Sequence, residues 1–135
     1  MVIGFDFGMK FIGVATGQNV TNTASPLTSL RAIDGIPAWD EIAQLIKTWN
    51  PTALIVGIPL QMDGGTQLTT HCAQKFANRL RHKFKLPVHL VDERLSTWEA
   101  KQRLKSPTKH PKYQQLPELN ALAAAVLVEQ WLQKS

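Results

Sequence analysis

Two acidic residues, Asp6 and Glu93, each close a stretch of sequence that has the pattern of a β-strand. Val2–Phe7 alternates so that Asp6 lies opposite the aromatic and isoleucine side chains, and a short apolar segment from Val88 leads into Glu93. If these strands meet at their ends, the two carboxylates converge as oxygen ligands for Mg²⁺ or Mn²⁺, and such a cluster supports phosphodiester hydrolysis. The alternative is that Asp6 forms an Asx turn in the hairpin that follows it.

The residues beside these acids indicate how a phosphate would be held. Neighbouring strand residues face opposite ways, so only one of Asp92 and Glu93 can share the side of Asp6. Arg94 and Lys10 follow the two strands closely and would contact the phosphate. The sequence thus predicts acids at the centre of a site and cations beside them.

Basic residues concentrate in the second half of the chain. Residues 75–112 hold eleven of the fifteen Lys and Arg and three acids, a net charge of +8, while the remainder carries −3. Clustered cations favour a polyanionic partner, most simply nucleic acid, because neutralised phosphates release their counterions. The candidate nucleic-acid contacts are Lys10, Arg94, Arg79, Arg81, Lys101 and Arg103. A solvated helical face explains the same charges without a partner.

Length and composition narrow the class of protein. A chain of 135 residues, 44% of them hydrophobic, predicts one globular domain over residues 1–135. Its longest apolar runs are far shorter than the roughly 20 residues of a transmembrane helix, and Met1 leads directly into a strand without a secretion signal. The single cysteine, Cys72, cannot form an internal disulfide, so we expect a protein of the reducing cytoplasm with no membrane contact.

The periodicity of apolar residues predicts the elements that would carry these side chains. The expected strands are Val2–Phe7, Phe11–Thr16, Thr21–Leu30, Ala53–Ile58 and Val88–Val91. The expected helices are residues 37–49, Gln67–Phe84, a segment from Ser96 to Leu104, and Pro117–Gln133. This order predicts an α/β fold with a mixed five-stranded sheet, in which three antiparallel strands precede β-α-β crossovers and helices pack on the sheet.

Three separated motifs resemble those of the YqgF family, bacterial proteins that are similar to Holliday-junction resolvases. Phe5–Ala15 is similar to the opening DFG-x-K-x-IGVA motif of that family, Val56–Gly64 is similar to its VGLP…MDG loop, and Asp92–Thr97 matches its DERLST motif. The motifs occur in the family's order and extend over nearly the whole chain, which makes the resemblance specific.

The resemblance implies an RNase H-like fold and a metal-dependent endonuclease of the cytoplasm that processes the 5′ end of the small-subunit (16S) rRNA precursor in ribosome biogenesis. It implies Asp6 and Glu93 as ligands of Mg²⁺ or Mn²⁺. Its partners would be structured or precursor RNA, ribosomal precursor particles or branched DNA, bound by a monomer or homodimer. The third catalytic position of the family, normally an acid, matches Asn120, which offers an oxygen but no charge, so metal affinity should be lower. Other acids that would replace it are Asp63, Asp92 and Glu118.

Other functions fit part of the sequence. Asn120 and the basic segment are compatible with a catalytically weakened nucleic-acid-binding protein, and a DNA nuclease similar to Holliday-junction resolvases would use the same acids. The segment Asp6–Lys10 also resembles the first phosphate loop of actin-like ATPases and sugar kinases. Those proteins need two lobes to enclose a nucleotide, whereas this chain has the length of one and lacks a second loop of that kind.

Overall fold

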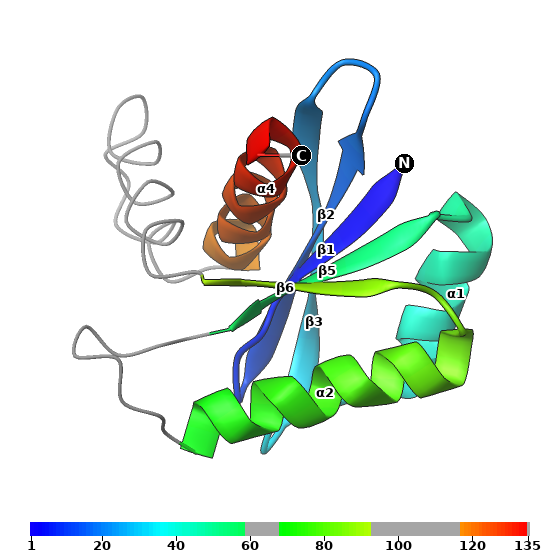
Figure 1. Ribbon diagram of the computed structural model, residues 1–135. Coiled ribbons are helices and arrows are strands. Elements are labelled where there is room, and N and C mark those ends of the chain that lie inside the picture. Colours follow the sequence, from blue (N-terminus) through cyan, green and yellow to red (C-terminus); the bar gives the residue numbers. More distant parts are fainter. Residues whose placement is uncertain (59–67, 93–116, 135) are drawn as a thin grey trace.

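The computed structural model describes residues 1–58, 68–92 and 117–134. These residues form a six-stranded sheet in the order β4-β3-β2-β1-β5-β6 with helices on both faces (Figure 1). The strands are β1 (Val2–Asp6), β2 (Phe11–Gln18), β3 (Thr23–Ile33), β4 (Ile36–Pro37), β5 (Ala53–Ile58) and β6 (Val88–Asp92). The helices are α1 (Trp39–Trp49), α2 (Leu68–Phe84) and α4 (Pro117–Lys134). The helix expected from Ser96 lies outside the described residues.

The sheet is mixed, as the order of the elements predicts. β1 pairs with β2, β2 with β3 and β3 with β4 in antiparallel fashion, whereas β1 pairs with β5 and β5 with β6 in parallel. Because parallel neighbours end at the same edge of a sheet, the carboxyl ends of β1, β5 and β6 lie together. The predicted α/β architecture is confirmed.

The number of strands differs from the predicted five because β4 is a strand of two residues. Asp34 and Gly35 both have positive φ, 51° and 79°, which is the geometry of a two-residue hairpin turn. The turn reverses the chain, so that Ile36 pairs with Ile33. Pro37, expected in the first turn of a helix, instead lies on this edge strand, where its missing N–H interrupts no ladder.

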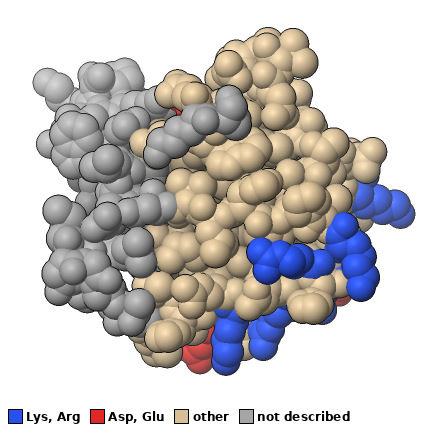
Figure 2. Space-filling view, in the orientation of Figure 1, with Lys and Arg blue, Asp and Glu red and all other residues tan. Residues whose placement is uncertain are grey.

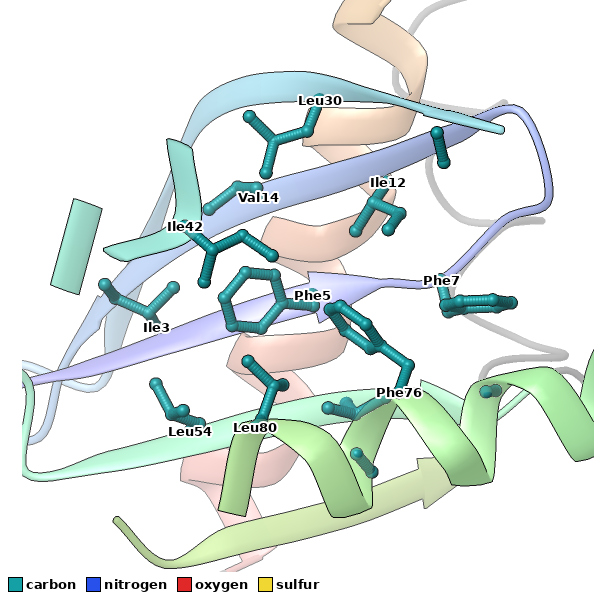
Figure 3. Close-up of a cluster of buried hydrophobic side chains, with 14 of the residues drawn as sticks. Ile3, Phe5, Phe7, Ile12, Val14, Leu30, Ile42, Leu54, Phe76 and Leu80 are labelled. Carbon is teal, nitrogen blue, oxygen red and sulfur yellow. The ribbon is translucent and has the colours of Figure 1, made fainter. Parts of the chain in front are cut away.

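The larger part of the core lies between the sheet and the helices α1 and α2 (Figure 3). β1 directs Ile3 and Phe5 to this side, Phe7 follows directly after the strand, and α2 contributes Phe76 and Leu80. The rings of Phe5 and Phe76 meet edge to face, with centroids 5.6 Å apart at an interplanar angle of 78°. Each large apolar side chain buried in this way contributes about 1.5–3 kcal/mol, so hydrophobic packing fixes both the position and the rotation of α2.

The opposite face of the sheet carries glycines where α4 lies close against it. A Cβ added to Gly4 would meet Val128 Cγ2, and a Cβ added to Gly13 would meet the backbone carbonyl of Asn120. The α4 side chains buried on this face are Ala124, Ala125, Leu127, Val128 and Leu132. Small residues on both sides bring the helix backbone onto the strands, so α4 has little freedom to shift.

The helix ends follow the local sequence. α1 stops at Asn50, a left-handed residue with φ 48°, whose N–H donates to the Ile46 carbonyl at 2.8 Å, and Pro51 cannot extend the helix. α2 and α4 begin and end within one residue of the predicted bounds. Within the part of the chain that the structure describes, no helix is long and apolar enough to cross a membrane.

Candidate active site

Asp6 lies at the sheet edge where the parallel strands end. It is the last residue of β1 and pairs with Gly57, one residue before the end of β5. β6 ends at the same level, where Asp92 pairs with Ile58. Ligand sites of α/β sheets form outside the carboxyl ends of the strands, so Asp6 occupies a position suited to function.

Asp6 faces α4 rather than the core beneath α1 and α2. Along β1, Val2 packs in the cluster under α4, whereas Ile3 packs in the cluster on the other face. Alternation then places Asp6 on the face of Val2 and Gly4. The Asp6 side chain is half-buried, so it combines a fixed position with access from the sheet edge.

A glycine brings Asn120 next to Asp6. Asp6 pairs with Gly13 across the β1–β2 ladder. A Cβ at Gly13 would overlap the carbonyl oxygen of Asn120 and lie 3.0 Å from the backbone nitrogen of Ala121. Only a residue without a Cβ lets the first turns of α4 lie directly on β2 at this point. The structure therefore brings together two of the three predicted catalytic positions.

The amino-terminal end of α4 lies at the Asp6 end of β1. Asn120 lies over Gly13, and Ala124 and Val128 lie over Gly4, so the helix runs antiparallel to β1. Unpaired N–H groups give a helix amino terminus a partial positive charge, which stabilises nearby anions by about 0.3–1 kcal/mol in exposed settings. This end of α4 therefore favours a carboxylate or a phosphate at the same edge.

Ser29 extends the row of residues under α4, and sequence reasoning gave it no role. Gly13 pairs with Ser29 of β3 on the side away from Asp6. The Ser29 Oγ is buried and has no hydrogen-bond partner among the described residues. Its place depends on the register of β3, which shifts between Val14 and Ala15 of β2. No sequence signal indicates such a shift, apart from Pro26 in the strand.

The structure places the predicted nucleic-acid-binding cations in different parts of the fold. Lys10 is exposed in the turn after β1, at the same edge as Asp6, and its carbonyl accepts a 2.7 Å hydrogen bond from the Ala32 N–H. Arg79 and Arg81 lie on α2, which packs on the sheet face opposite α4. The structure does not bring these two arginines to Asp6. The remaining predicted site residues, Glu93, Arg94, Lys101 and Arg103, lie outside the described residues.

The described residues fit part of a metal site. A carboxylate from Asp6 and an amide oxygen from Asn120 are hard donors of the kind that Mg²⁺ and Mn²⁺ prefer. Within residues 1–58, 68–92 and 117–134, no three His, Cys, Asp or Glu side chains are grouped to hold a metal ion. The oxygen donors of these two residues suit a divalent cation. Because Asp6 supplies only one negative charge, a further carboxylate is needed to balance the charge of the ion.

Comparison with known proteins identifies relatives along the whole chain. A protein of Coxiella burnetii (strain Dugway 5J108-111), named "Putative pre-16S rRNA nuclease", is 48% identical over 136 residues, covering 99% of this chain and 93% of its own. A protein of the same name from Legionella pneumophila (strain Philadelphia 1) is 50% identical over 135 residues, covering 98% and 95%. The chain thus has full-length relatives at about half identity.

Solved structures show the same fold at low sequence identity. The RuvC protein of T. thermophilus in complex with a Holliday junction substrate matches with a TM-score of 0.56 and 16% identity, over 98% of this chain and 93% of that one. The fowlpox virus Holliday junction resolvase matches with a TM-score of 0.52 and 12% identity, over 99% of both chains. These matches confirm the predicted RNase H-like fold. The family described as "RuvX: Holliday junction resolvase" matches residues 1–134, and this chain belongs to that family.

Proposed function

We propose that this protein is a metal-dependent endonuclease that cuts the precursor of the small-subunit rRNA, an activity of ribosome assembly in the bacterial cytoplasm. The names of its full-length relatives support the substrate. The observation that carries the chemistry is the position of Asp6, half-buried at the carboxyl edge of the parallel strands and beside Asn120.

In the proposed site, Asp6, Glu93 and Asn120 would hold Mg²⁺ or Mn²⁺ through oxygen atoms. Such an ion supplies an activated water and stabilises the charge that develops on the phosphodiester. β6 brings the chain to the same edge as Asp6: its last residue, Asp92, pairs with Ile58 of β5, and Val91 packs with the cluster under α4, the face that Asp6 shares. Glu93 follows β6 directly in the sequence and matches an acid of the family motif, which supports it as the second acid.

Other residues of the chain would orient the substrate. β2 and β5 pair with β1 on both sides, so the backbone of Asp6 is fixed before substrate binds. The amino-terminal end of α4 attracts the phosphate, and Lys10 adds a flexible cation at the same edge. The protein thus supplies position and positive charge around the scissile phosphate, which are the main requirements of phosphodiester cleavage.

Replacement of Asp6 tests this proposal. Loss of an outer partner of a metal ligand reduces metal affinity or activity by about 10–100-fold, so Asp6→Asn, which removes the negative charge of a direct ligand, should reduce Mn²⁺-dependent cleavage of precursor rRNA by more than about 100-fold. Asp40→Asn is the matched control, because Asp40 is exposed in the first turn of α1. Equal cleavage by Asp6→Asn and the wild type, at equal thermal stability, would refute the assignment.

One observation also favours a weaker catalyst that mainly binds nucleic acid. At the position that matches the family's third acid, this chain has Asn120, whose amide brings no charge to bind a metal ion. Asn120→Asp should then increase cleavage and lower the Mn²⁺ concentration needed for half-maximal activity, whereas Asn50→Asp, at the exposed end of α1, should change neither. A fall in cleavage with Asn120→Asp would show that the amide itself serves the reaction. A four-way DNA junction and precursor RNA, offered to the same variants, distinguish the two substrate classes.

A further inference from the structure

Helix α2 carries a dense positive charge that the proposed cleavage site does not use. Its seventeen residues include Lys75, Arg79, Arg81 and Lys83 and no Asp or Glu. The helix packs on the sheet face opposite Asp6 and α4. Lys and Arg side chains gather along the lower part of Figure 2, where Figure 1 shows α2. This charge requires an explanation separate from the carboxyl edge.

Three of the four cations form one line, which we name the α2 stripe: Lys75, Arg79 and Lys83. Their four-residue spacing places them on one side of the helix over about 12 Å, since each residue rises about 1.5 Å. All three are exposed, whereas Phe76 and Leu80 of the same helix are buried against the sheet. Within residues 1–58, 68–92 and 117–134, no hydrogen bond or ion pair engages the charged groups of the stripe.

Arg81 differs from the stripe because its guanidinium group donates hydrogen bonds to two other residues of the protein. Its Nη1 donates to Asn78 Oδ1 at 2.9 Å, and its Nη2 donates to the carbonyl of Val88 at 3.3 Å. These contacts tie α2 to the start of β6. Arg81 therefore has a role in the fold, whereas the cations of the stripe make no hydrogen bond or ion pair with the described residues.

The stripe borders a cavity of about 100 Å³ between α2 and the β3–β4 hairpin. Lys75 and Arg79 line one wall, and Asp34 and Gly35 of the hairpin turn line another. The Gly35 N–H donates to the Met9 carbonyl at 2.9 Å, which fixes the hairpin to the turn after β1. The cavity offers two cations to a small anionic group, with one acid close by.

An aromatic pair supports the far end of the stripe. Lys83 Nζ lies 5.1 Å from the centroid of the Trp39 ring, a cation–π contact. The Trp39 ring also stacks on Phe76, with centroids 5.6 Å apart at an interplanar angle of 25°. With Phe76 and Lys83 as its neighbours, Trp39 is poorly placed to stack on a nucleic-acid base. A ligand of this surface is therefore recognised through charge and not through base stacking.

We propose that the α2 stripe is a second RNA contact, which binds the phosphate backbone of the substrate outside the cleavage site. One phosphate occupies the cavity beside Lys75 and Arg79, and the strand continues past Lys83. A line of evenly spaced cations matches a repeating polyanion better than a single anion, and phosphate contacts of this kind are independent of sequence. The proposal takes the identity of the substrate, RNA, from the proposed function.

Salt dependence measures this contact directly. Each phosphate contact adds about 0.7 to the slope of log affinity against log salt for a single strand, so the triple variant Lys75→Gln/Arg79→Gln/Lys83→Gln should lower the slope by about 2. Over a rise from 50 to 200 mM salt, the wild type should then lose about 16-fold more affinity for precursor RNA than the variant does. Arg79→Gln alone should lower the slope by about 0.7.

Lys47→Gln is the matched control for Arg79→Gln, because Lys47 is an exposed cation in the last turn of α1. It removes the same charge and should leave the slope unchanged. Equal slopes for Lys47→Gln and Arg79→Gln, whether both unchanged or both reduced, would overturn the proposal. Circular dichroism and thermal unfolding of each variant establish that the fold is retained.

Replacement of Asp34 tests the same contact by removing a negative charge, which should raise the affinity for RNA instead of lowering it. Asn tolerates the left-handed conformation that Asp34 adopts at φ 51°, so Asp34→Asn should preserve the turn while it removes the acid that lines the cavity. Affinity for RNA should rise about two- to five-fold, since a repelling charge near the bound phosphate is lost. Unchanged or weaker binding would show that no phosphate occupies the cavity.

Separate assays test the cleavage proposal and the α2 proposal, so the failure of one can be distinguished from the failure of the other. Binding is measured in the Asp6→Asn background, where no cleavage is expected, and the α2 variants should show the same losses there. If the wild type does not cleave but the triple variant loses RNA affinity, the second contact stands without the nuclease assignment. If Asp6→Asn abolishes cleavage but the triple variant binds RNA with the wild-type salt slope, only the α2 proposal is overturned.

Discussion

Gly13→Ala probes the contact that places Asn120 beside Asp6. The new methyl group would meet the carbonyl oxygen and carbon of Asn120 and the nitrogen of Ala121. All three are backbone atoms, so no side chain can rotate to make room, and α4 itself must move. Overpacking of a well-packed core costs about 1–3 kcal/mol, and we expect a destabilisation of about 3 kcal/mol because the obstacle is rigid.

Gly4→Ala is the matched comparison on the same face of the sheet. Its methyl group would meet Val128 Cγ2 first, while the nearest backbone atom, the Ala124 carbonyl oxygen, is 3.7 Å away. A valine side chain can give way more readily than a helix backbone, so the cost should be nearer 1 kcal/mol. The glycine pair thus compares a backbone obstacle with a side-chain obstacle.

Urea unfolding, monitored by tryptophan fluorescence, measures the free energy of unfolding of both variants. A cost of about 3 kcal/mol corresponds to a fall in Tm of roughly 10 °C for a chain of this size. Below the unfolding transition, Gly13→Ala should also reduce cleavage more than Gly4→Ala does, because it separates Asn120 from Asp6. Equal stability and equal activity of the two variants would refute the reasoning that a backbone contact at Gly13 positions the first turns of α4.

Two further substitutions test the packing on each face of the sheet. Leu80→Ala should destabilise the protein by about 2–5 kcal/mol, because Leu80 is fully buried between α2 and the sheet; a loss below 1 kcal/mol in urea unfolding would contradict this packing. Ser29→Ala should leave the Tm unchanged or raise it, since its buried hydroxyl has no partner among the described residues. A fall of several degrees would show that the hydroxyl is bonded.

The sequence predicted most elements of the fold because their apolar patterns are strong. The continuous apolar run of β5 reflects burial on two faces. β1 is buried on two faces as well, and its alternation separates the large side chains Ile3 and Phe5 on one face from Val2, Gly4 and Asp6 on the face that α4 covers. β4 was missed because two residues carry no periodicity, and Pro37 is equally compatible with a helix start. The extension of β3 to Ile33 was missed for a related reason. Ala32 and Ile33, the last two residues of β3, pair with β4, which the sequence did not indicate.

The candidate site was only partly predictable from the residues. Asp6 stands out because an acid at a strand end is unusual, whereas Asn120 was identified through the family motif. Its place beside Asp6 depends on the close approach at Gly13, which is a property of helix packing. The sequence predicted Arg79 and Arg81 as nucleic-acid contacts but not their distance from the acids, since periodicity shows which side of a helix faces outward but not which face of the sheet the helix covers.

The hairpin turn at Asp34–Gly35 joins the two proposed RNA contacts mechanically. Its hydrogen bond to Met9 attaches the cavity wall to the short connection that leaves Asp6, so the separation between the cavity and the carboxyl edge is set by rigid backbone. An oligonucleotide too short to bridge that separation engages one contact at a time and gains no avidity from the other. Affinity should therefore rise steeply at a threshold length of RNA, which is set by the separation between the two proposed contacts.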